Sequence, residues 1–149
     1  MGKNHVILLV EDNPDDEELT RLAFKECKFV NELVVTRDGQ EALDYLFVAG
    51  KYSDRDVANQ PQVILLDLKL PKVDGLEVLR RIRGHHKTKL LPVVMLTSSK
   101  QEQDILASYS LGINSYIQKP VDFNQFIEAV RQLGLYWLVL NEAAATTGK

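Results

Sequence analysis

The sequence predicts an α/β fold in which a parallel sheet is doubly wound by helices. Short, continuous apolar runs rich in Val, Ile and Leu occur at Val6–Val10, Val63–Leu66 and Val93–Leu96. Runs of this length are typical of strands that are buried on both faces. Segments with helical periodicity separate these runs, so that strand and helix alternate five times along the chain, as in a doubly wound sheet.

The first helix follows the first strand and has a well-marked start. Asn13 is suited to the N-cap position and Pro14 to the first helical position. The acidic residues from Asp15 to Glu18 complement the positive end of the helix dipole. We therefore expect a helix that begins at Pro14.

The remaining elements follow in order along the chain. Further helices are expected at Gln40–Val48, Leu76–Arg83, Gln101–Leu111 and Phe123 to about Leu140. The second and fifth strands are weaker predictions, at Leu33–Val35 and Ser115–Ile117. The longest polar connection, Gly50–Gln60, is expected to be a surface loop. We expect one domain over residues 1–149, with its core at 5–130 and an apolar helical extension at 131–142.

The composition is that of an ordinary globular domain, with 149 residues, 45% hydrophobic and 26% charged. The net charge of -3 argues against binding to nucleic acid. The single cysteine, Cys27, cannot form an internal disulfide and fits a reducing compartment. The acidic pair Glu11–Asp12 comes too early for a signal peptide, and no apolar run approaches the ~20 residues of a membrane helix. We expect a cytoplasmic protein that does not enter the membrane.

Reactive side chains occur at the carboxyl ends of the predicted strands. The first strand leads to Glu11 and Asp12, and the third leads to Asp67. The fourth leads to Thr97 and the fifth to Lys119. Neighbouring parallel strands end at one edge of the sheet, ~5 Å apart. Three carboxylates at that edge repel one another unless a cation neutralises them, and Mg²⁺ is a hard cation that prefers oxygen ligands.

These residues and their surroundings resemble the CheY-like receiver domain of two-component response regulators. The shared strings are Ile7–Asn13, Leu66–Leu68, Leu70–Pro71, Asp74–Gly75, Pro92–Thr97 and Gly112–Pro120. They follow the family's order and spacing from about residue 5 to residue 130. The resemblance implies five parallel strands in the order 2-1-3-4-5.

The resemblance also implies a phosphorylation switch. Asp67 would attack a phosphohistidine on a sensor histidine kinase and form an acyl phosphate. Mg²⁺ would bind Asp12, Asp67 and the backbone carbonyl of Lys69, and Glu11 through water. We expect a phosphoacceptor that assists only its own phosphorylation and dephosphorylation, and not an enzyme with a separate substrate.

Further roles are implied for residues around the phosphoacceptor. Lys119 would neutralise charge on the phosphoryl oxygens, where phosphoryl transfer requires it. Thr97 would donate its hydroxyl to the phosphoryl group, and the resulting loop movement would let Tyr116 rotate. Lys119–Pro120 would be a cis peptide. Asp74–Gly75 would form a turn in which glycine takes a conformation closed to other residues.

Lys69 departs from the pattern of many family members, which have Asn or another polar residue two places after the phosphoacceptor. Its ammonium can reach the acidic cluster and compete weakly with Mg²⁺. It can also hinder the water molecule that hydrolyses the acyl phosphate. The hypothesis that follows is a long-lived phosphorylated state.

Three features narrow the resemblance to the small response regulators paired with cyanobacterial phytochromes: the long loop Gly50–Gln60, the string Ile64–Leu68 and the Trp-bearing C-terminal segment. A phytochrome-type histidine kinase would then be the phosphoryl donor. Leu22, Ala23 and the opening of the first helix would meet that kinase. Related receivers serve other kinases, so the identity of the kinase stays open.

The segment Leu133–Leu140 is apolar on nearly every side of a helix. It is either a buried helix end or a homodimer interface. We expect the homodimer, anchored by Tyr136, Trp137 and Leu140, because large exposed apolar patches usually mark contacts. No DNA-binding or catalytic domain follows residue 140, so we expect the output to be binding to a downstream protein that the sequence does not identify.

The same residues argue against two other functions. A haloacid dehalogenase-type phosphatase needs a second Asp two residues after the first, where this chain has Lys69. A flavodoxin needs a phosphate-binding loop rich in Ser, Thr and Gly after the first strand. This chain has the acidic segment Glu11–Pro14 there, which would repel a phosphate. A receiver that only docks partners and is never phosphorylated stays open. His85 and His86, in the basic loop Arg83–Lys89, are expected at the surface and not in a metal site.

Overall fold

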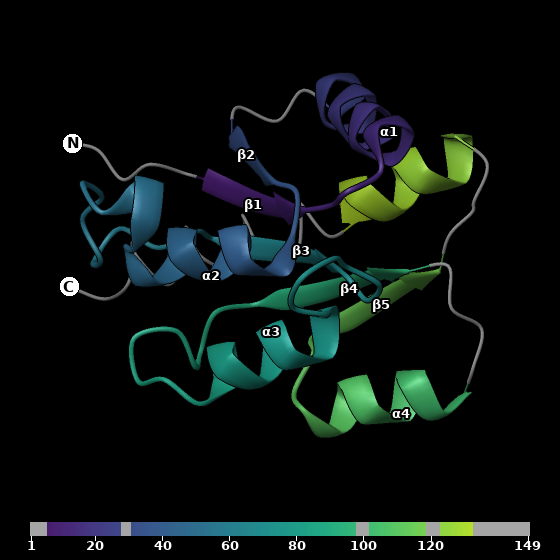
Figure 1. Ribbon diagram of the computed structural model, residues 1–149. Helices are drawn as coiled ribbons and strands as arrows, with labels where there is room; N and C mark the ends of the chain where they lie inside the picture. Colours follow the sequence, from purple (N-terminus) through teal and green to yellow (C-terminus); the bar gives the residue numbers. More distant parts are fainter. Residues whose placement is uncertain (1–5, 28–30, 98–101, 119–122, 133–149) are drawn as a thin grey trace, which may run out of the picture.

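A computed structural model confirms the predicted architecture. The structure describes residues 6–27, 31–97, 102–118 and 123–132. Five parallel strands form one sheet in the order β2-β1-β3-β4-β5, with helices on both faces (Figure 1).

Each strand lies where the sequence predicted it. The strands are β1 (Val6–Val10), β2 (Glu32–Thr36), β3 (Val63–Asp67), β4 (Val93–Thr97) and β5 (Ser115–Gln118). β3, β4 and β5 each continue one residue beyond the apolar run, because the backbone hydrogen bonding continues past the last apolar side chain. Asp67 is the last residue of β3, which confirms the prediction that this strand ends at Asp67.

The helices also agree with the prediction to within one residue at most described ends. They are α1 (Pro14–Glu26), α2 (Gly39–Phe47), α3 (Gly75–Arg83) and α4 (Glu102–Ser110), followed by helical residues 123–132. Asn13 caps α1 as predicted, since its Oδ1 accepts the N–H groups of Asp15 at 2.8 Å and Asp16 at 3.2 Å.

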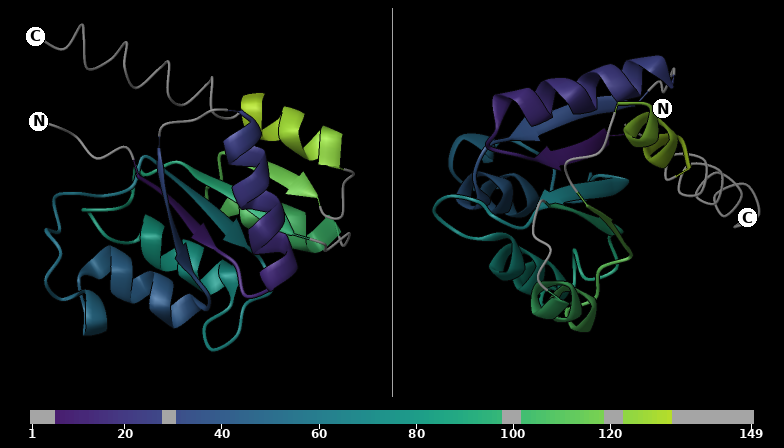
Figure 2. Two further views of the ribbon diagram at one scale, coloured as in Figure 1. Left: turned by 90° about the horizontal axis from the view of Figure 1, so that it is seen from above. Right: turned by 90° about the vertical axis from the view of Figure 1, so that its right-hand side faces the viewer.

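The sheet is buried between two apolar layers. Leu8 and Ile64 contribute to the layer beneath α2 and α3, while Ile7 and Leu65 contribute to the opposite layer. Figures 1 and 2 show α1 and helix 123–132 over one face and α2, α3 and α4 over the other. Every residue of β1 and β3 is buried, which explains why their sequences are continuously apolar rather than alternating.

The predicted surface loop, Gly50–Gln60, is anchored to α2 by specific contacts. It opens with a short 3-10 helix, η1 (Gly50–Tyr52). The Arg55 guanidinium lies 3.8 Å from the centre of the Tyr45 ring, and Arg55 Nε donates to the Tyr45 carbonyl at 3.0 Å. The Tyr52 hydroxyl donates to Glu41 Oε2 at 2.7 Å. The loop is therefore a fixed part of the fold.

Within the described ranges, no helix is both long and apolar enough to span a bilayer. The residues predicted to form a dimer, Tyr136, Trp137 and Leu140, lie outside the described residues. Their interface therefore stays a prediction.

Candidate metal centre

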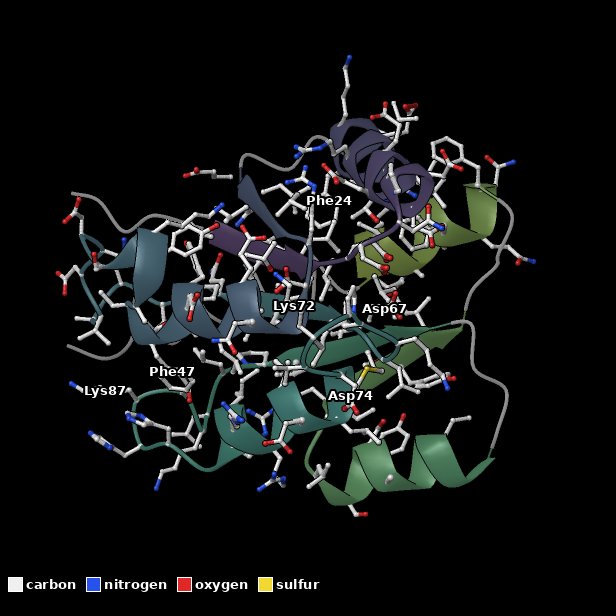
Figure 3. The ribbon with its side chains drawn as sticks, viewed as in Figure 1. Phe24, Phe47, Asp67, Lys72, Asp74 and Lys87 are labelled. Carbon is white, nitrogen blue, oxygen red and sulfur yellow. The ribbon has the colours of Figure 1, made fainter. Side chains whose placement is uncertain are left out.

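Three carboxylates meet at the carboxyl edge of the sheet, where the sequence predicted them. Oxygen atoms of Glu11, Asp12 and Asp67 all lie within 4.8 Å of one another. The strand register explains this proximity, because Val10 pairs with Leu66 and the next residue of each strand stands at the same level. Figure 3 shows Asp67 at this edge, near the start of α1.

The three carboxylates differ in exposure. Glu11 is 1% exposed and Asp67 is 7% exposed, whereas Asp12 faces solvent. The backbone N–H of Asn13 donates to Glu11 Oε2 at 3.3 Å, and the backbone N–H of Lys69 donates to Asp67 Oδ1 at 3.3 Å. These bonds orient the buried carboxylates, but three negative groups this close still repel one another. A cation at their centre would relieve that repulsion.

The geometry suits a hard divalent cation. At metal–oxygen distances of about 2.0–2.1 Å, ligand oxygens in an octahedral site lie about 2.9 Å apart when adjacent and about 4.2 Å apart when opposite. Separations of up to 4.8 Å therefore require only small side-chain rotations to reach such a site. The exposed Asp12 leaves room for water ligands. The residues fit Mg²⁺, while the Lys69 carbonyl and the water-mediated role of Glu11 remain predictions.

The loop after β3 packs tightly against the end of that strand. The N–H of Gly75 donates to the Leu68 carbonyl at 2.9 Å, and a Cβ built on Gly75 would lie 2.3 Å from the Asp67 carbonyl oxygen. Gly75 is the first residue of α3 and its φ is not positive. The prediction that it takes a conformation closed to other residues is therefore wrong. Glycine is needed here because two backbone segments touch.

The strained residue of this loop is Lys72, which sequence reasoning missed. Lys72 has a φ of 68°, and the N–H of Val73 donates to the Pro71 carbonyl at 2.8 Å across it. This is a γ-turn of the rare positive-φ type. Pro71 and Asp74–Gly75 are signals of a turn in the sequence, but neither specifies a γ-turn at Lys72. The Lys72 ammonium lies 3.5 Å from Asp38 Oδ2, which links the loop to the start of α2.

The structure describes the other predicted site residues only in part. Thr97 ends β4, one residue beyond the pair formed by Leu96 and Asp67, so its backbone lies at the same edge as the carboxylates. The Thr97 side chain and the residues Lys119 and Pro120 lie outside the described part. Their roles and the cis peptide stay predictions.

Three more predicted residues can be located. Tyr116 is half-buried in β5 and packs against the apolar layer beneath α2 and α3. Its predicted rotation stays a prediction. Leu22 is exposed on α1, as a contact residue must be, but Ala23 is fully buried beneath the same helix. The prediction that Ala23 meets a kinase is therefore wrong, because α1 turns this residue toward the core.

Lys69 is exposed, and its side chain has no ion-pair partner among the residues that the structure describes. The acidic cluster lies two residues away along the chain. The reach of the Lys69 ammonium into this cluster stays a prediction.

The sequence and the structure of this chain are both similar to those of known proteins. The sequence matches the response regulator receiver domain over residues 7–131. The structure is similar to that of the phosphorylated cyanobacterial phytochrome response regulator RcpA, with a TM-score of 0.82 and 41% identity over 91% of this chain and 94% of that one.

Two further relatives are similar over most of their length. Response regulator Rcp1 of Synechocystis sp. is 40% identical over 89% of this chain and 88% of its own, and its Mn²⁺-bound structure gives a TM-score of 0.81. The bacteriophytochrome response regulator AtBRR is 56% identical over 91% of this chain and 96% of that one, with a TM-score of 0.76.

Proposed function

The chain belongs to the response regulator receiver domain family, and on this basis we propose that Asp67 accepts a phosphoryl group from a sensor histidine kinase in a Mg²⁺-dependent signalling switch. The observation that carries the proposal is the convergence of Glu11, Asp12 and Asp67 within 4.8 Å at the carboxyl edge of the sheet. Two of the three carboxylates are buried, which is costly unless the site is neutralised in use.

The chemistry follows from the positions of these groups. A carboxylate oxygen of Asp67 attacks the phosphorus of a phosphohistidine, a P–O bond forms, and the P–N bond to the imidazole breaks. The N–H of Lys69 holds Asp67 Oδ1 and limits rotation of the nucleophile. Asp12, Asp67 and the backbone carbonyl of Lys69 would hold the cation, with Glu11 contributing through water, and the cation would supply positive charge to the phosphoryl oxygens.

Three other residues complete the proposed switch. The Lys119 ammonium balances the remaining phosphoryl charge. The Thr97 hydroxyl donates a hydrogen bond to the new phosphoryl group, and Tyr116 rotates in response. The altered surface then changes which partner protein binds. The switch turns over no separate substrate, and we place it in the cytoplasm.

The proposed phosphoryl donor is a phytochrome-type histidine kinase. The support is similarity to RcpA and AtBRR, both described as phytochrome response regulators. The exposed Leu22 on α1 offers an apolar contact for the kinase. Phosphotransfer from a purified bacteriophytochrome kinase should be faster than from an unrelated histidine kinase at equal concentration. Equal phosphotransfer rates from the two kinases would contradict the phytochrome assignment but not the receiver function.

We also propose a homodimer through Tyr136, Trp137 and Leu140. The support is the apolar character of Leu133–Leu140 in the sequence. Sedimentation should give a dimer at micromolar concentration that Trp137→Glu converts to a monomer. A monomeric wild type would overturn this part of the proposal.

The experiment that tests the phosphoacceptor uses intact mass. The protein is incubated with Mg²⁺ and acetyl phosphate, and one added phosphate is expected in the wild type and none in Asp67→Asn. Asp74→Asn is the matched control, because Asp74 is a nearby exposed carboxylate whose capping bond to the Glu77 N–H an asparagine can keep. Phosphate on Asp67→Asn, or none on the wild type, would contradict the assignment. The second result would favour a receiver that only docks partners.

A further inference from the structure

The end of the molecule opposite the carboxylate cluster carries a concentration of positive charge. Figure 3 shows Phe47 and Lys87 at this end, away from Asp67. The segment 77–91 contains a single carboxylate, on Glu77, although the whole chain has a net charge of -3. Its permanent cations are Arg80, Arg81, Arg83, Lys87 and Lys89.

Part of this charge has a structural role and part has none. Arg80 and Arg81 both pair with Glu77 on the surface of α3 and also complement the negative end of the helix dipole. Lys87 and Lys89 follow the helix, are exposed, and have no ion-pair partner in the described ranges. Their ammonium groups are available to an external anion.

A shallow hollow with an aromatic floor lies among these cations. Its lining residues are Phe47, Arg80, Arg81, Gly84 and His85. The rings of Phe47 and His85 lie 5.0 Å apart, and His85 stacks on His86 at 4.8 Å. Guanidinium groups beside an aromatic floor suit an apolar side chain flanked by carboxylates.

The loop beside the hollow carries an exposed apolar side chain on a hydrogen-bonded turn. Leu90 is 87% exposed. The turn that carries it is ordered, since the Lys89 N–H donates to the His85 carbonyl at 2.8 Å and the buried Thr88 hydroxyl donates to the Ile82 carbonyl at 2.7 Å. A partner that covers Leu90 therefore does not need to order the loop first.

We propose that these residues form a docking surface, made of Phe47, Arg80, Arg81, His85, Lys87, Lys89 and Leu90, for an acidic segment of a partner protein that carries an apolar side chain. Carboxylates of the segment pair with Lys87 and Lys89, and its apolar side chain contacts the Phe47–His85 floor. The exposed Leu90 favours a protein over a nucleic acid, because an apolar side chain of the partner can cover it. Because the surface lies opposite Asp67, the partner leaves the phosphoacceptor accessible.

The test uses a synthetic peptide of glutamates around a central Trp-Leu pair, titrated into the protein at low ionic strength. Amide shifts in NMR spectra are expected at residue 47 and residues 80–91 and not around residue 67. A peptide with Ala-Ala in place of Trp-Leu should bind at least about fivefold more weakly, because it lacks the apolar anchor. Absence of binding, or shifts elsewhere, would overturn the proposal.

Matched charge reversals separate a local site from net charge. Lys87→Glu should lower the affinity for the peptide at least about fivefold. Lys25 is an exposed lysine on α1, and Lys25→Glu should leave the affinity nearly unchanged. Both side chains are exposed, so urea unfolding should confirm that both variants fold normally. Equal losses of peptide affinity in the two variants would show that net charge, and not a local site, determines binding. If single-stranded oligothymidine bound the same residues more tightly than the peptide, the partner would be a nucleic acid and the proposal would be overturned.

Discussion

The contact between Gly75 and the end of β3 leaves no room for a side chain. A Cβ on Gly75 would lie 2.3 Å from the Asp67 carbonyl oxygen and 2.7 Å from Leu68 Cα, and both are backbone atoms that cannot rotate away. Gly75→Ala should therefore lower the free energy of unfolding by about 2 kcal/mol, measured by urea denaturation. It should also slow phosphorylation of Asp67 by acetyl phosphate.

Gly84→Ala is the matched control for this prediction. Gly84 caps α3 with a φ of -88°, and its nearest non-bonded neighbour would be the Arg80 carbonyl oxygen at 3.3 Å. Alanine adopts that conformation, so the free energy of unfolding should change by less than about 1 kcal/mol. If Gly75→Ala is as stable as Gly84→Ala, the close approach at Gly75 does not restrict the loop.

We expect Lys69 to lengthen the lifetime of the proposed acyl phosphate. Its exposed ammonium lies two residues after Asp67, where it can obstruct the hydrolytic water. Lys69→Asn should speed dephosphorylation about fivefold, equivalent to about 1 kcal/mol in barrier height. The measurement is loss of phosphate from purified phosphoprotein, followed by intact mass. Lys72→Asn, at another exposed lysine of the loop, provides the comparison, and an unchanged rate for Lys69→Asn would remove the hypothesis.

At the scale of elements, Glu41 ties η1 and the following loop to α2. Burial alone would raise the pKa of Glu41, but hydrogen bonds from the Arg37 N–H, the Tyr52 hydroxyl and Lys51 lower it below its usual value. A carboxyl with a lowered pKa in the folded state contributes stability above its unfolded pKa. That contribution is lost as the pH falls through the folded pKa.

Glu41→Gln should therefore destabilise the protein at neutral pH and have a smaller effect in acid. Urea midpoints measured between about pH 7 and about pH 3 should fall less steeply for the variant than for the wild type. Glu18→Gln, at an exposed position of α1, should keep the wild-type slope. Parallel curves for Glu41→Gln and the wild type would show that the carboxylate does not anchor the loop.

The elements differ in how far the sequence could predict them. β1, β3 and β4 were recognisable because their described residues are buried on both faces and are therefore continuously apolar. β2 gave a weaker signal, since it is an edge strand whose central residues, Leu33–Val35, are only half-buried. The anchoring of the loop by Arg55 could not be predicted, because it depends on which carbonyls of α2 and the loop the folded chain brings near.

The candidate site shows the same division. Glu11, Asp12 and Asp67 were predictable because parallel strands bring their carboxyl ends to one edge. The positive φ at Lys72 and the close packing at Gly75 were not, because they arise where the loop after β3 meets other backbone segments. Sequence patterns report local conformation and burial, whereas contacts between distant backbones appear only in three dimensions.

At the scale of the whole molecule, a cation bound by the carboxylate cluster would couple metal binding to folding. Glu11, Asp12 and Asp67 converge only in the folded chain, so a cation bound there stabilises the fold by mass action, by about 2.7 kcal/mol at a hundredfold excess over the dissociation constant. MgCl₂ should therefore raise the urea midpoint above that in NaCl of equal ionic strength.

Asp12→Asn should be more stable than the wild type in EDTA, because one repulsive charge is gone, and should gain less from Mg²⁺. Asp54→Asn, at an exposed position in the loop after α2, should respond to Mg²⁺ like the wild type. A full Mg²⁺ response in Asp12→Asn would mean that the cation binds elsewhere.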